Sequence, residues 1–109
     1  MGTSGHENIT PRALKSRLDA GERPVLLDVR EPWEFELASI EGSELIPMSQ
    51  LEERFTELDP ASETVVICHH GNRSSYVARA LQRVGFEKAL NLEGGLEAYS
   101  SVDESVPRY

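Results

Sequence analysis

The sequence has very little cysteine, with Cys68 the single thiol among 109 residues. One cysteine excludes a disulfide within the chain and favours a reducing compartment, so we expect a cytoplasmic protein. Long apolar runs are missing as well: no stretch approaches the length of a membrane span, and we expect no signal peptide. Positive charge is scarce, with 11 Lys and Arg against 19 Asp and Glu and a formal net charge of −8. This balance argues against binding to nucleic acids or to anionic membranes.

Repeats and low-complexity tracts are also absent, and the length is that of one domain with one core. The first residues are polar and include two glycines, so we expect residues 1–8 to form a flexible terminus and residues 9–109 to form the domain. His6 lies in this terminus, and we expect it to be solvated rather than to bind a ligand.

Apolar runs that alternate with helical patterns predict an α/β domain with a mostly parallel sheet and helices on both faces. The expected strands are Val25–Val29, Leu45–Pro47, Val65–Cys68 and Leu90–Leu92. Five helices are expected. The first is capped by Thr10 with Pro11 at its first position, and a short second helix around Trp33, Phe35 and Leu37 packs an apolar edge over the sheet. The others run from Gln50 to about Leu58 with a capping box of Ser49 and Glu52, from Ser74 or Ser75 to Val84, and from Ala98 and Tyr99 onward. In such a sheet the turns at residues 28–30, 68–73 and 94–95 collect at one end and can form a pocket.

The chemistry of the chain concentrates around Cys68. Three apolar residues run straight into this cysteine, and we expect a loop from Cys68 to Arg73 followed by a helix. A helix start presents unpaired N–H groups and a positive dipole, and Gly71 permits a loop that turns further N–H groups inward. Arg73 adds a permanent cation suited to oxyanions, and a thiolate in this cradle is a nucleophile.

A plainer interpretation is that Cys68 is a small buried hydrophobe, as lone cysteines often are. Its position argues against this, because ligands bind at the ends of strands in α/β sheets. His69 and His70 suggest a metal or a general base, but adjacent residues point in different directions and no second Cys/His cluster completes a metal site. We expect these histidines to line the loop and to add partial positive charge near neutral pH.

The segment Cys68–Ser74 resembles the active-site loop of the rhodanese-like sulfurtransferases, in which cysteine and arginine bracket four residues. Three further segments agree with that family in the same order, namely Val25–Phe35, Ile40–Pro47 and Asn91–Leu96, the last followed by Pro107. The resemblance covers about residues 9–109. It implies the family's sheet of about five strands.

The resemblance also implies an activity: transfer of a sulfane sulfur from thiosulfate or a persulfide donor to cyanide, a thiol or a protein, through a persulfide on Cys68. The loop residues bind the substrate and stabilise its charge; they are His69, His70, Gly71, Asn72, Arg73 and Ser74. Arg73 either holds the oxyanion of the donor or stiffens the loop. No metal or organic cofactor is needed for this chemistry.

Two residues at the end of the first long strand are expected to support the site. The carboxylate of Asp28 is expected to tie a turn through hydrogen bonds, and the resemblance adds a pairing with an arginine near the active loop. Arg30 is a candidate second cation at the pocket rim, with a surface salt bridge to Glu31 or Glu34 as the alternative.

Two other functions remain open at this point. A cysteine phosphatase or arsenate reductase also surrounds an anion with a cysteine–arginine loop, but that loop has five intervening residues, where this chain has four. A binding module or sulfur carrier that keeps the fold without turnover is the second alternative, and the presence of Cys68 with Arg73 disfavours a purely inert module.

Overall fold

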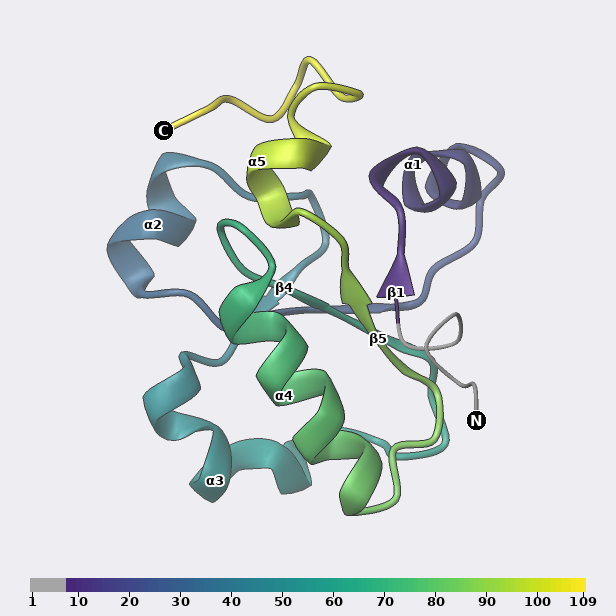
Figure 1. The fold of residues 1–109 in the computed structure, drawn as a ribbon, viewed down its shortest axis with the longest axis vertical. Helices are drawn as coiled ribbons and strands as arrows, with labels where there is room; N and C mark the ends of the chain where they lie inside the picture. The colour runs from purple at the N-terminus through teal and green to yellow at the C-terminus, as the bar shows by residue number, and fades with distance from the viewer. Residues whose placement is uncertain (1–7) are drawn as a thin grey trace.

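The computed structural model describes residues 8–109, so the expected flexible terminus at residues 1–7, including His6, lies outside the described range. A five-stranded parallel sheet forms the centre of the molecule (Figure 1). The strands are β1 (Asn8–Ile9), β2 (Val25–Asp28), β3 (Glu44–Leu45), β4 (Thr64–Ile67) and β5 (Ala89–Leu92), in the order β1-β5-β4-β2-β3. The predicted α/β class is therefore confirmed, whereas Asn8 belongs to a strand and not to the terminus.

Strand β4 lies in the middle of the sheet between β2 and β5, and core clusters on both faces bury it along its whole length. Alternate side chains of β4 point to opposite faces. Val65 and Ile67 join a core cluster with residues of α1 (Pro11–Asp19) and α5 (Gly95–Tyr99). Val66 and Cys68 join the cluster on the other face, which includes residues of α4 (Asn72–Arg83).

Helices thus cover both faces of the sheet, as predicted (Figure 1). Figure 1 shows α1 and α5 on one side and α3 (Leu51–Arg54) with α4 on the other. No helix within residues 8–109 combines the length and the apolar character needed to cross a bilayer.

Local signals at α1 act as the sequence predicts. The Thr10 side chain accepts a hydrogen bond of 3.1 Å from the backbone N–H of Ala13, and Pro11 takes the first helical position. This arrangement satisfies one of the free N–H groups of the first turn and uses a residue that has no N–H to satisfy.

The expectation for the segment around Trp33 is wrong in its packing. A helix does form there, α2 (Pro32–Leu37), but Trp33 is 61% exposed and Leu37 is 55% exposed. Its buried residue is Glu34. The helix therefore turns a carboxylate inward and not an apolar edge. This carboxylate pairs with Arg73.

The expected helix from Gln50 to Leu58 is interrupted. The chain forms a 3₁₀ turn at Met48–Gln50, the single turn of α3, and a second 3₁₀ turn at Phe55–Glu57. Ser49 lies inside the first 3₁₀ turn and not at a helix start, so the expected capping box does not form.

Helix α5 also begins earlier than expected. It runs over Gly95–Tyr99, so Ala98 and Tyr99 end it rather than begin it. This shift brings the start of the helix against the loop that follows β4.

Candidate active site

The sulfur of Cys68 faces the amino end of α4. The backbone N–H groups of Gly71 and Ser74 donate to Sγ at 3.1 and 3.3 Å, and the Ser74 hydroxyl lies 3.3 Å away. Helix α4 has 12 residues, so its dipole adds positive potential at the same point. The expected cradle of N–H groups around Cys68 is present, although Cys68 is only 1% exposed.

The loop is shorter than predicted. Helix α4 begins at Asn72, so Asn72 and Arg73 belong to its first turn and the loop comprises residues 68–71. Gly71 caps the helix with φ of 98°, a conformation that costs other residues free energy. A Cβ atom at Gly71 would also lie 3.2 Å from the backbone nitrogen of Gly94. Glycine at this position therefore permits both the turn and the close approach of a second loop.

The second loop is the double-glycine segment before α5. The N–H of Leu96 donates to the carbonyl of Cys68 at 2.8 Å, and the N–H of Glu97 donates to the carbonyl of His69 at 3.0 Å. A Cβ atom on Gly95 would overlap with the backbone of His69. The two loops that the sequence placed at one end of the sheet do meet, and they are joined through their backbones.

Ser74 links the sulfur to β5. Its Oγ lies 2.5 Å from Oδ1 of Asn91, and Nδ2 of Asn91 donates to Oδ1 of Asn8 at 3.1 Å. A hydroxyl has one proton, so Ser74 donates either to Asn91 or to Sγ. If it donates to Asn91, its oxygen can accept a hydrogen bond from the Cys68 thiol. Asn91 was not among the predicted site residues. Its only sequence signal is a polar side chain between two leucines of a strand.

Arg73 is held by Glu34 of α2. Its two terminal nitrogens donate to the two carboxylate oxygens at 2.9 and 3.1 Å. This pairing, with burial acting in the opposite direction, lowers the pKa of Glu34 to about 2. The hydroxyl of Tyr109 donates to the same carboxylate at 2.9 Å. The ion pair fixes the Arg73 guanidinium in the first turn of α4.

Both roles suggested for Arg30 are wrong. Arg30 is fully buried, so it is neither a cation at a pocket rim nor part of a surface salt bridge. Its Nε and Nη2 donate to the two oxygens of Asp28 at 2.8 and 2.7 Å. Further bonds reach the carbonyls of Glu34 and Ala38 and the hydroxyl of Tyr109.

Asp28 matches the turn that the sequence predicted. Its Oδ1 accepts the backbone N–H of Arg30 at 3.1 Å, and its carboxylate neutralises the buried Arg30 guanidinium. The arginine that pairs with Asp28 is therefore two residues away in the chain, and Arg73 pairs elsewhere.

His69 lies in a stack of three rings. Its centroid is 4.0 Å from that of His70 and 4.0 Å from that of Tyr109, with interplanar angles of 28° and 14°. Burial, and then the neighbouring His70, lower the pKa of His69 below its ordinary 6.5. A lower pKa reduces the positive charge that His69 carries near neutral pH.

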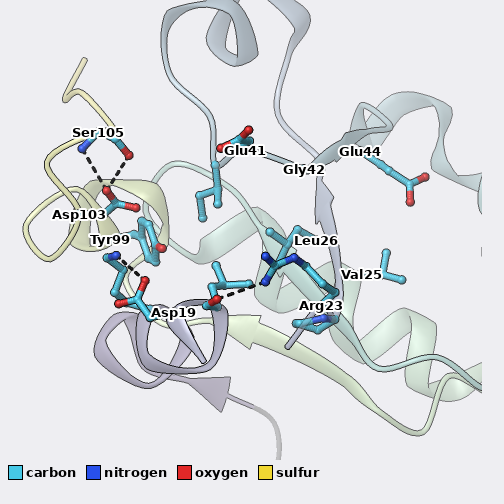
Figure 2. Close-up of a pocket in the computed structure, with 14 residues that line it drawn as sticks. Asp19, Arg23, Val25, Leu26, Glu41, Gly42, Glu44, Tyr99, Asp103 and Ser105 are labelled. Atoms are coloured by element: carbon cyan, nitrogen blue, oxygen red, sulfur yellow. Dashed lines mark hydrogen bonds and ion pairs between the residues drawn. The ribbon is translucent and has the colours of Figure 1, made fainter. Parts of the chain in front are cut away.

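A cavity of about 650 Å³ lies away from the Cys68 loop, against α1, the start of β2 and the segment after α5 (Figure 2). Charged groups of both signs line it, and several of them have hydrogen-bond partners within the protein. Lys15 binds Asp19 at 2.8 Å, and Asp103 accepts two bonds from Ser105. The candidate site remains at Cys68, where N–H groups converge on one sulfur atom.

The fold and the site together define a class: a small α/β domain that holds a thiol at the carboxyl end of its central parallel strand and at the amino end of a helix. Residues 10–102 match the family model of the rhodanese-like domain. The chain belongs to the rhodanese-like domain family.

Curated relatives of the chain carry names from sulfur chemistry. It is 38% identical over 102 residues to the "Putative sulfurtransferase YtwF" of Bacillus subtilis (strain 168), covering 94% of this chain and 96% of that protein. It is 38% identical over 96 residues to the "Putative sulfur carrier protein YrkF" of the same organism, covering 88% of this chain but only 52% of YrkF. The chain thus spans about half of YrkF and nearly all of YtwF.

Solved structures share the fold. The crystal structure of a rhodanese-related protein from Thermoplasma volcanium has a TM-score of 0.83 and 32% sequence identity, over 94% of this chain and 99% of that one.

Proposed function

We propose that this protein transfers sulfane sulfur through a persulfide on Cys68, with thiosulfate or another persulfide as donor and cyanide, a thiol or a protein as acceptor. The observation that carries the proposal is the pair of N–H groups, from Gly71 and Ser74, directed at Sγ. Groups fixed in this way stabilise negative charge on the reacting sulfur without reorganising during the reaction. The sulfurtransferase name of YtwF, which matches almost end to end, supports the same chemistry.

The reaction has two half-steps. In the first, the Cys68 thiolate attacks the outer sulfur of thiosulfate, an S–S bond forms to Cys68, the S–S bond of the donor breaks, and sulfite leaves with its electron pair. In the second, the acceptor attacks the outer sulfur of the persulfide, and the Cys68 thiolate leaves. The cycle is a ping-pong reaction with a covalent intermediate and has no net redox change.

The remaining loop residues shape the entrance. His70 in the loop and Asn72 at the start of α4 are exposed, whereas Gly71 and Ser74 are buried with the sulfur. Since Cys68 is almost inaccessible, we assign to His69, His70 and Asn72 the contact with the donor as a small movement of the loop admits it. Arg73 contributes charge beside the sulfur while Glu34 keeps it in place. The buried ion pair of Asp28 and Arg30 stabilises the turn at the end of β2.

The decisive experiment measures the intact mass of the protein after treatment with thiosulfate. We expect the mass to rise by one sulfur atom and a thiol to reverse this gain. Cys68→Ser should show no gain, and circular dichroism should show that its fold is retained. Arg73→Ala should reduce thiosulfate:cyanide sulfur transfer by weakening donor binding or turnover. A persulfide mass that persists in Cys68→Ser would contradict the proposal.

A sulfur carrier is the second candidate, and the YrkF name together with the buried sulfur favours it. A carrier would accept one sulfur per chain yet turn over slowly with cyanide. Single loading measured by mass, compared with the steady-state rate, separates the two functions. The single cysteine leads us to place either function in the cytoplasm.

A further inference from the structure

Three potential metal ligands meet beside the Cys68 loop: His69, His70 and Glu97. One ligand atom from each lies within 4.8 Å of the others, and Nε2 of His69 is 3.6 Å from Oε1 of Glu97. His69 and His70 come from the loop after β4, and Glu97 comes from α5. This cluster is distinct from the N–H groups of Gly71 and Ser74 that face the sulfur.

The cluster brings together ligands that the sequence did not suggest would meet. Adjacent histidines were expected to point apart, but their rings lie face to face, 4.0 Å between centroids. The sequence offers no second Cys/His cluster, and the further ligand is instead a carboxylate, that of Glu97, 27 residues further along the chain (97 against 70). Sequence spacing could not reveal this, because the contact depends on how α5 docks against the loop.

One buried nitrogen in the cluster is unsatisfied among the described residues. Nε2 of His69 is buried and finds no hydrogen-bond partner within residues 8–109. Nearly all buried polar atoms in folded proteins have such a partner, so an exception calls for an explanation. The ring cannot easily turn away, because Tyr109 and His70 stack on its two faces.

The main chain of Glu97 is tied to that of His69. The backbone N–H of Glu97 donates to the carbonyl of His69, so the two ligands are fixed relative to each other through the main chain. The other oxygen of Glu97 lies 3.6 Å from Nε of Arg108, which orients the carboxylate. Ligands that the fold holds in place in this way lose little freedom when an ion binds.

We propose that His69, His70 and Glu97 bind a divalent transition-metal ion of the Zn²⁺ type. Two imidazoles and one carboxylate are a donor set that Zn²⁺ accepts, with bonds of about 2.0–2.2 Å and a fourth position left to solvent. Such bonds bring ligand atoms to within roughly 3–4 Å of one another. The 3.6 Å separation between His69 and Glu97 already meets this, and the exposed His70 ring has to move inward by about 1 Å. The bound ion would fasten the Cys68 loop to α5.

The test titrates the full chain with ZnCl₂ by isothermal calorimetry in a buffer that does not bind zinc, and follows Co²⁺ binding by its visible absorption. We expect binding of one ion per chain and a rise in Tm when the ion is present. Glu97→Gln and His70→Asn should each weaken binding at least tenfold, because even loss of a hydrogen bond to a metal ligand costs roughly 10–100-fold in affinity. Glu87→Gln, the same change at an exposed position outside the cluster, should leave the affinity within about twofold.

Cys68→Ser separates this site from the thiol. We expect it to bind Zn²⁺ as the unaltered protein does, with a Co²⁺ spectrum that has no thiolate charge-transfer band in either protein. Loss of binding in Cys68→Ser would overturn the proposal, and so would unchanged binding in both Glu97→Gln and His70→Asn. Circular dichroism of each variant shows whether the fold is retained, and both altered ligands reach the surface, so misfolding should not obscure the result. The outcome does not depend on whether Cys68 transfers sulfur.

Discussion

Glu34 on α2 and Arg73 on α4 form a bidentate ion pair across 39 residues of chain, with N···O distances of 2.9 and 3.1 Å. The pair fixes the first turn of the helix whose N–H groups face Cys68. The hydroxyl of Tyr109 joins it by donating to Glu34 while it accepts a bond of 2.8 Å from Arg30. Three segments that are distant in sequence therefore meet at one carboxylate beside the site.

Replacing that carboxylate should affect both stability and activity. Glu34→Gln keeps the shape of the side chain but removes the charge, so Arg73 loses its partner and the first turn of α4 loosens. We expect the free energy of unfolding to fall by about 1–3 kcal/mol, measured by urea denaturation, and sulfur transfer to slow. The range is below that for a fully buried pair because Arg73 is partly exposed. Glu36→Gln, on an exposed position of the same helix, is the control and should change stability by less than about 0.5 kcal/mol.

Acid should weaken the fold through the same group. The pKa of Glu34 is lowered from its ordinary 4.5 to about 2 in the folded chain, chiefly by the hydrogen bond from Arg73. The unfolded chain therefore binds the proton first, and the stabilisation is present above pH 4.5 and is lost as pH falls toward 2. The difference in unfolding free energy between the unaltered protein and Glu34→Gln should shrink over this window. A difference that stays constant from pH 6 to pH 2.5 would show that the charge of Glu34 does not stabilise the fold.

Gly95 is expected to tolerate no side chain. Gly95→Ala adds a Cβ that overlaps with the backbone of His69 and also has to adopt φ of 66°. Gly85→Ala is the matched control, because Gly85 has φ of 105° but open space around its Cβ position. The control should lose about 1 kcal/mol from backbone strain alone, and Gly95→Ala a further 1–3 kcal/mol from the clash. Equal losses of stability in the two variants would mean that the loop after β4 and the segment before α5 can move apart without a further loss of free energy.

Much of the fold follows from local patterns in the sequence. The apolar run before Cys68 predicted the central strand, and Thr10 with Pro11 predicted the start of α1. Strand β1 was missed because two residues carry no periodic signal. That strand exists through its pairing with Asn91 and Leu92.

The site was only partly predictable, for a related reason. The N–H groups around Cys68 could be expected because a strand, a glycine and a helix start follow one another directly. The burial of Arg30 could not be expected, since it depends on the carbonyl of Ala38 and the hydroxyl of Tyr109. Charged residues are mostly exposed, so a sequence does not reveal which of them the fold will bury with partners from distant segments. The same holds for Glu34.

The placement of β4 between β2 and β5 has a consequence for the persistence of the site. Amides in a central strand exchange with solvent only through the largest opening events, whereas short edge strands such as β1 and β3 fray. Cys68 directly follows that innermost strand, so the hydrogen–deuterium exchange protection of the strand's amides should approach that of global unfolding. Heat or denaturant should then abolish sulfur chemistry in the same transition that melts the whole domain, with no earlier inactive stage.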